Sequence, residues 1–167
     1  MLDPKIEDAL NNQINHEIAS AYNYLAMAAF LERKNMTGMA HWMLLQRQEE
    51  LEHAMRLYRY VLDRGGKVAL AAVAKPQSDF ASIHKVFDEA QKMEVENTTA
   101  INDVYAKAVE LNDYATQSNL KWFLDEQVEE EKLMDEVLSL VELAGEDTSA
   151  LLVLNRQLGE RQPGAGA

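Results

Sequence analysis

The chain has 167 residues, of which 47% are hydrophobic, and this length and composition suit one globular domain with a single core. Its formal net charge of −12 argues against nucleic acid, because phosphate binding needs clustered Lys and Arg, and it favours cations as partners or serves solubility alone. The absence of Cys excludes disulfides and thiolate ligands and fits a reducing compartment, for which the cytoplasm is the default.

The N-terminal stretch MLDPKIEDALNN has no basic region leading into an apolar one, so we expect no ordinary export signal. The longest apolar runs, LAMAAFL and VALAAVA, are far too short to span a bilayer, and we expect no membrane partner. Gly and Pro are scarce outside the last residues, while Ala, Leu, Glu and Gln are common. This composition favours helix nearly throughout.

The first two predicted helices are joined by a short link. Asp3 and Pro4 predict the N-cap and first residue of a helix that reaches about residue 34. Thr37 can cap a second helix, which runs to the stop signal Gly65-Gly66. Because only a few residues separate them, these two helices are expected to be antiparallel neighbours.

Residues 66–82 lack helical caps and contain Pro76, which predicts an extended connection whose apolar residues pack on the surface of the domain. Ser82 then begins a third helix, which reaches about residue 112. Asp113 begins a fourth helix, which ends at Gly145. A shorter fifth helix starts near Thr148 and carries LLVLNRQLGER.

The long connection sets the topology. Fully extended, it reaches roughly 50 Å, enough to cross the second helix and bring the third back parallel to it. The sequence therefore predicts an all-α fold: a four-helix bundle with one long crossover between helices two and three, plus a short fifth helix. We expect one domain over residues 1–160 and a flexible tail over residues 161–167.

Polar residues interrupt the core-facing seam of every long helix. Read in steps of three and four, the seams also contain Gln46 and Asn97 and are otherwise mostly apolar. Glu50-x-x-His53 places a carboxylate and an imidazole one turn apart on one face. At 1.5 Å per residue, the interruptions lie about 18–27 Å along helices of roughly 45 Å, and so meet near the middle of the bundle. The interrupting acidic, imidazole and adjacent amide residues are Glu17, Glu50, His53, Glu94, Gln127 and Glu130.

Four carboxylates in an apolar core need compensation, because each would otherwise cost several kcal/mol or take up a proton. Two divalent cations would balance them, and oxygen ligands with one imidazole suit iron or manganese. The competing interpretation is a protonated, hydrogen-bonded polar layer that fixes helix register.

With these residues the chain resembles the ferritins, most closely the bacterial non-haem ferritins, over nearly all of residues 1–160. Ferritin-like di-iron bundles use a Glu from each of two helices and a Glu-x-x-His pair from each of the other two. This sequence matches with Glu17, Glu94 and Glu50-x-x-His53, and departs with Gln127-x-x-Glu130. That asymmetry is similar to true ferritins rather than to bacterioferritins, whose axial haem Met has no counterpart in Leu51 or Glu52. No haem is expected.

The resemblance implies a role for each site residue. Glu17, Glu50 and His53 would bind one iron, with Glu50 bridging, while Glu94 and Glu130 would bind the second and Gln127 would be a weaker contact or an orienting group. An accessory third iron site carries over onto acidic residues that could equally form a solvated face: Glu49, Glu126, Glu129 and Glu130.

Two aromatic residues near the centre are open to more than one interpretation. Tyr24 resembles the family's redox-active tyrosine, or is a core Tyr with a bonded hydroxyl. Trp122 resembles a family position near the site, where a packing role is favoured.

The implied function is iron storage with ferroxidase activity, in which O₂ or peroxide oxidises Fe(II) and the mineral grows inside a hollow shell of 24 subunits. The apolar ALLVL face of the fifth helix favours subunit contact. One alternative is a rubrerythrin-like di-iron peroxidase, which normally adds a Cys-rich module. Others are a DNA-protecting mini-ferritin, which often has basic tails, and a bundle with no metal.

Overall fold

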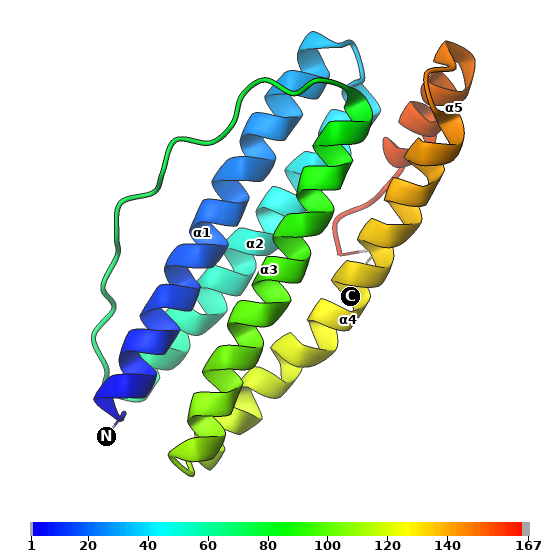
Figure 1. Ribbon diagram of the computed structural model, residues 1–167. Coiled ribbons are helices and arrows are strands. Elements are labelled where there is room, and N and C mark those ends of the chain that lie inside the picture. Colours follow the sequence, from blue (N-terminus) through cyan, green and yellow to red (C-terminus); the bar gives the residue numbers. More distant parts are fainter. Residues whose placement is uncertain (1, 165–167) are drawn as a thin grey trace.

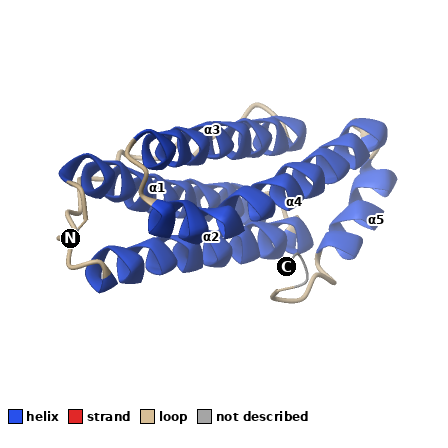
Figure 2. Ribbon diagram, turned by 90° about the horizontal axis from the view of Figure 1, so that it is seen from below, coloured by secondary structure: helices blue, strands red, loops and turns tan. Residues whose placement is uncertain are grey.

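The computed structural model describes residues 2–164 and confirms the all-α prediction, since this part of the chain contains no strand. Four long helices form an elongated bundle, and the shorter α5 lies beside the end that carries the α1–α2 loop (Figures 1 and 2). None of the described helices is both long and apolar enough to cross a membrane. The helices are α1 (Pro4–Arg33), α2 (Thr37–Asp63), α3 (Ile83–Glu110), α4 (Tyr114–Ala144) and α5 (Thr148–Leu158).

Most helix starts follow the predicted capping. Asp3 accepts a hydrogen bond from the Lys5 backbone N–H at 2.8 Å, with Pro4 as the first helical residue. Ser82 and Asp113 cap α3 and α4 in the same way.

The predicted cap at Thr37 is wrong. Thr37 is already the first residue of α2, and the N-cap is Met36, whose side chain makes no capping hydrogen bond within the described structure. Instead, Asn35 takes a left-handed φ of 58°, and the Met36 N–H donates to the Leu31 carbonyl at 3.0 Å. Backbone bonds close this turn and leave the Met36 side chain free to enter the core.

The crossover between α2 and α3 runs along the outside of α1 (Figure 1). Asn11 donates to the Lys67 carbonyl and accepts from the Ala69 N–H, at 2.9 and 2.7 Å. One turn further along α1, Asn15 repeats this pattern with the Ala69 carbonyl and the Ala71 N–H, at 3.0 and 2.8 Å. The two side-chain amides therefore form hydrogen bonds with backbone N–H and C=O groups of an extended segment that has no neighbouring strand.

The apolar residues of this crossover only partly follow the prediction that they pack on the domain. Val68 and Phe80 pack against the core, but Leu70 is 67% exposed and Val73 is 37% exposed. Backbone bonds to α1 hold this part of the segment, yet residues 69–75 are all exposed, so side-chain packing does not fix its position.

The core consists of two apolar clusters separated by a layer of buried polar residues. The cluster nearer the α1–α2 loop includes Tyr24, Met43, Phe87 and Met134, and the cluster at the other end includes Ile14, Leu57, Ile101 and Phe123. The interrupted seams are thus confirmed as core faces. Apolar packing on both sides keeps the polar layer in a low-dielectric environment, where charges interact strongly.

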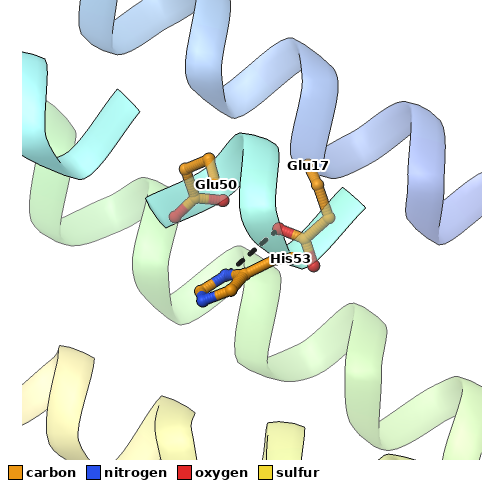
Figure 3. Close-up of side chains that lie close together, drawn as sticks. All are labelled: Glu17, Glu50 and His53. Carbon is orange, nitrogen blue, oxygen red and sulfur yellow. Dashed lines mark ion pairs between the residues drawn. The ribbon is translucent and has the colours of Figure 1, made fainter. Parts of the chain in front are cut away.

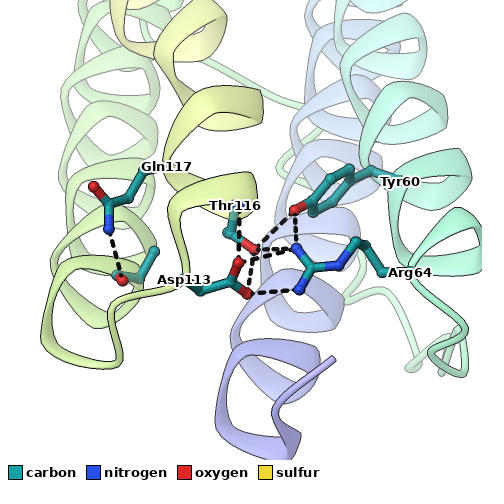
Figure 4. A network of polar contacts seen from close by, with 6 residues as sticks. Tyr60, Arg64, Asp113, Thr116 and Gln117 are labelled. Carbon is teal, nitrogen blue, oxygen red and sulfur yellow. Dashed lines mark hydrogen bonds and ion pairs between the residues drawn. The ribbon is translucent and has the colours of Figure 1, made fainter. Parts of the chain in front are cut away.

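A polar network ties the end of α2 to the α3–α4 turn (Figure 4). Two Arg64 nitrogens donate to the two Asp113 oxygens at 3.0 and 3.1 Å, and the Tyr60 hydroxyl lies 2.9 Å from the Thr116 hydroxyl. Burial raises the pKa of Asp113, but the bonds from Arg64 and Thr116 outweigh it and lower that pKa below its usual range. This anchor holds α2 and α4 in register, and with them the acidic residues midway along both helices.

α5 packs closely on the start of α2. A Cβ added to Gly38 would lie 1.8 Å from the Asn155 carbonyl oxygen, and one added to Gly159 would lie 3.0 Å from the Gly38 Cα. Leu154 and Leu158 of α5 are buried, while its opposite face exposes apolar side chains, among them Leu152 and Val153.

The chain keeps contact with the bundle beyond the predicted boundary at residue 160. Arg161, which was expected to begin a flexible tail, has a side chain that is only 9% exposed, and it donates to Glu49 of α2. Residues 165–167 lie outside the described part of the chain, so the prediction of flexibility there stays a prediction.

Candidate metal centre

All six residues predicted for the di-iron centre are buried in the polar layer between the two apolar clusters. Glu17 comes from α1, Glu50 and His53 from α2 (Figure 3), Glu94 from α3, and Gln127 and Glu130 from α4. One ligand atom from each of Glu17, Glu50 and His53 lies within 4.8 Å of the others, and Glu17 Oε2 is 4.0 Å from His53 Nδ1. These three side chains are placed to hold one metal ion.

The carboxyl groups of the layer affect one another. Burial, followed by repulsion from Glu94 and Glu17, raises the pKa of Glu50 well above its usual range. Burial and repulsion from Glu130 raise the pKa of Glu94 to about 8. The raised pKa values mean that the charged carboxylates are disfavoured in the metal-free layer. A metal ion therefore competes with protons for these groups, and its apparent affinity rises with pH.

Several buried polar atoms have no hydrogen-bond partner among the described residues. They include Glu50 Oε2, Glu94 Oε2, His53 Nδ1 and Gln127 Oε1. An unpaired buried polar atom costs about 1–3 kcal/mol, and a hydrogen-bonded layer that only fixed register would pair these groups with one another. Unpaired oxygen and nitrogen atoms gathered in one layer fit divalent cations better, and these donor atoms suit iron.

Amide side chains hold Glu17 in place. Gln13 Nε2 donates to Glu17 Oε1 at 2.8 Å and to Asn97 Oδ1 at 2.7 Å, and Asn97 Nδ2 donates to Glu17 Oε2 at 3.2 Å. Sequence reasoning placed Asn97 on the seam of its helix but gave it no role, and it missed Gln13. The available signal was the position of Gln13 one turn before Glu17 on the same helix.

Residues on α2 and α3 position Glu130 and Gln127, which both lie on α4. Gln46 Nε2 donates to Glu130 Oε2 at 2.8 Å. Gln127 Nε2 donates to the Thr98 hydroxyl at 3.2 Å and to the Glu94 carbonyl at 3.4 Å. The nitrogen of Gln127 is thus engaged, which leaves its unpaired oxygen available as a ligand.

Tyr24 is fully buried, and its hydroxyl donates a hydrogen bond to Glu94 Oε1. Burial and repulsion from Glu94 and Glu50 raise the pKa of Tyr24 well above its ordinary value, which keeps the hydroxyl protonated. The bonded hydroxyl agrees with the core interpretation, and it also places the ring beside the centre.

His53 is covered by aromatic rings. It packs edge-on against Trp122, with ring centroids 5.4 Å apart, and against Phe123 at 5.9 Å. Arg56 lies over the Trp122 ring at 4.1 Å. Trp122 therefore has the packing role that the sequence favoured, next to a candidate metal ligand.

The residues predicted for the accessory site are only partly brought together. Glu49 and Glu126 line a cavity of about 610 Å³ that also includes His53, whereas Glu129 is exposed. Burial raises the pKa of Glu49 above its usual range, although the nearby Arg161 opposes this shift. Glu49 is thus already paired with a cation that belongs to the chain.

A helical bundle with a long crossover and a buried carboxylate and histidine centre is the architecture of the ferritin-like proteins. Residues 7–144 match the family model described as the Ferritin-like domain, and the chain belongs to this family, as the sequence resemblance predicted.

Similar proteins span almost the whole chain. The bacterial non-heme ferritin of Staphylococcus aureus is 38% identical over 161 residues, covering 96% of this chain and 97% of its own. That of Staphylococcus saprophyticus is 36% identical, covering 96% of each. Among solved structures, the open pore ferritin from the hyperthermophilic archaeon Archaeoglobus fulgidus superposes with a TM-score of 0.95 at 41% identity, covering 97% of this chain and 100% of that one. A closed form engineered from the Archaeoglobus ferritin has the same TM-score and identity, covering 97% and 99%.

Proposed function

We propose that this protein stores iron and oxidises Fe(II) to Fe(III) at the buried centre. The observation that carries the proposal is the set of unpaired ligand atoms on Glu50, His53 and Glu94, in the same buried layer as Glu17 and Glu130. The similarity to bacterial non-heme ferritins supports the choice of iron. Iron is the substrate and the stored cargo, and the lack of Cys favours the cytoplasm as its location.

Each ligand has a distinct role in this proposal. Glu17, Glu50 and His53 bind one Fe(II), Glu50 is shared with the second, and Glu94 and Glu130 complete that second position. Four carboxylates balance the charge of two divalent ions, which removes the repulsion present in the metal-free layer. Gln127 offers its oxygen as a weaker contact with the second ion.

The oxidant of Fe(II) in this proposal is O₂ or peroxide. Two Fe(II) ions give two electrons, which reduce one O₂ to hydrogen peroxide or one peroxide to two water molecules, with two protons taken up. Gln13 and Asn97 hold both Glu17 oxygens in place, and Tyr24 holds one oxygen of Glu94. Fixed ligands require little rearrangement when the charge of the bound ions rises.

After oxidation, Fe(III) leaves the centre and collects as a mineral inside a hollow shell of 24 subunits. Exposed apolar side chains on α5 and on the crossover support assembly, because such surface is normally covered in an oligomer.

We expect the apo protein at neutral pH to run as 24 chains of 18.9 kDa each, about 450 kDa. After Fe(II) is added in air, iron should co-elute with this species in amounts far beyond two ions per subunit. Native mass spectrometry and iron analysis of the same fraction test both points. A monomer or simple dimer would contradict the shell, and uptake that stops at two ions per subunit would contradict storage.

A further inference from the structure

The segment that follows α5 carries Arg161 back onto α2. His41 Nε2 donates to the Arg161 carbonyl at 3.1 Å, and the Arg161 guanidinium lies 5.2 Å from the centre of the Trp42 ring. The backbone and side chain of Arg161 are therefore both held by the start of α2, as expected for a residue in a defined position.

The close approach of α5 to α2 explains this position. Asn155 Oδ1 accepts from the Met39 N–H at 2.9 Å, beside the contact between Gly38 and Gly159. With α5 docked there, the residue two positions after Gly159 reaches the next turns of α2. Its contacts on α2, Trp42, Gln46 and Glu49, follow one another by four and three residues and so share one face of that helix.

The Arg161 guanidinium connects the C-terminal segment to the metal centre. One terminal nitrogen donates to both Glu49 oxygens, at 3.1 and 2.9 Å. The other donates to Gln46 Oε1, which turns the amide so that Gln46 Nε2 donates to Glu130 at 2.8 Å. The chain of contacts therefore runs from Arg161 through Gln46 to a predicted iron ligand.

We propose that Arg161 takes the place of a third cation beside the di-iron centre, and that it must release Glu49 before a metal ion can bind there. This inference rests on the proposed function and adds a limit to it: with Arg161 docked, each subunit holds two ions and not three.

Charge and geometry support this role. The guanidinium keeps its positive charge at any accessible pH, and one of its nitrogens contacts both Glu49 oxygens while the other is bonded to Gln46. A divalent ion at Glu49 would have to displace these bonds and overcome the repulsion of the buried guanidinium. Without Arg161, by contrast, Glu49 would be a half-buried carboxylate facing a cavity that Glu126 also lines.

Anaerobic calorimetric titration of the assembled shell with Co(II) tests the proposal by counting tight sites per subunit. We expect two for the wild type and three for Arg161→Gln. Arg161→Lys keeps the charge and should bind two ions. A purely structural role of Arg161 would give no reason for the Lys and Gln variants to differ in this way. The control Arg156→Gln removes an exposed Arg of α5 and should also bind two.

The double variant Arg161→Gln with Glu49→Gln identifies the new ligand, because it should return to two sites. Should Arg161→Gln fail to assemble, Arg161→Met keeps an apolar stem on Trp42 without charge and should bind three. Three tight sites in the wild type, or two in both uncharged variants, would overturn the role of Arg161. No tight site in any of these proteins would overturn the proposed function, and the inference with it.

Discussion

Replacing Glu50 with Ala is expected to abolish rapid Fe(II) oxidation and leave the apo protein folded. Glu50 is the carboxylate that both ions share in the proposed centre, so its loss removes a ligand from each. Stopped-flow absorbance after mixing with two Fe(II) per subunit measures the oxidation directly. We expect a rate no faster than that of Fe(II) in buffer.

The same substitution should cost the apo protein little or no stability. Burial and the neighbouring carboxyl groups raise the pKa of Glu50, so its presence is unfavourable until metal arrives. Replacing buried ionisable groups is often neutral or stabilising by about 1–4 kcal/mol, and the cavity left by a smaller side chain opposes this with a similar magnitude. We expect an apo melting temperature close to or above that of the wild type, without the increase that added metal gives the wild type.

Glu52→Ala is the matched control, because Glu52 lies on the same helix but is exposed and bonds only Gln48. It should oxidise iron at the wild-type rate. A Glu50→Ala protein that is strongly destabilised yet oxidises iron normally would mean that Glu50 is a structural core residue.

Gly38→Ala should release α5 from the bundle. The new Cβ would lie 1.8 Å from the Asn155 carbonyl oxygen, and a helix backbone yields only by moving as a whole. Exposing Leu154 and Leu158 loses about 1.5–3 kcal/mol each. If the free energy needed to open α5 falls by about 3 kcal/mol, trypsin should cleave α5 about 100-fold faster. Limited trypsin digestion, followed by mass spectrometry at Arg156, measures that rate.

Thr37→Ala is the control for Gly38→Ala, since Thr37 is the neighbouring residue, is exposed and makes no capping bond in the described structure. It should be cleaved at the wild-type rate. Equal cleavage of Gly38→Ala and wild type would show that α5 shifts to accept the methyl group and that the close contact does not hold it.

The sequence predicted the bundle and the polar layer because both follow from local periodicity. Glu17 and Glu50 stand where apolar residues would otherwise complete a seam, so their helices alone reveal them. The start of α2 was mispredicted because backbone bonds from Met36, rather than a Thr37 hydroxyl, close the turn. Periodicity carries no information on such bonds.

Contacts between distant segments could not be predicted for a related reason. Asn11 holds the crossover more than fifty residues away, and Arg161 reaches Glu49 across most of the chain. The local sequence around each residue does not indicate which distant residue it contacts. Gln13 lies beside the seam rather than on it, so its bonds to Glu17 and Asn97 appear only once α1 and α3 are packed together.

Anomalous diffraction at the iron edge, from crystals soaked anaerobically with Fe(II), tests the proposed di-iron centre most directly. We predict two peaks inside each bundle, one contacting Glu17, Glu50 and His53 and the other contacting Glu94 and Glu130. Bundles with no iron peak, whose polar layer is joined only by hydrogen bonds and water, would contradict the account.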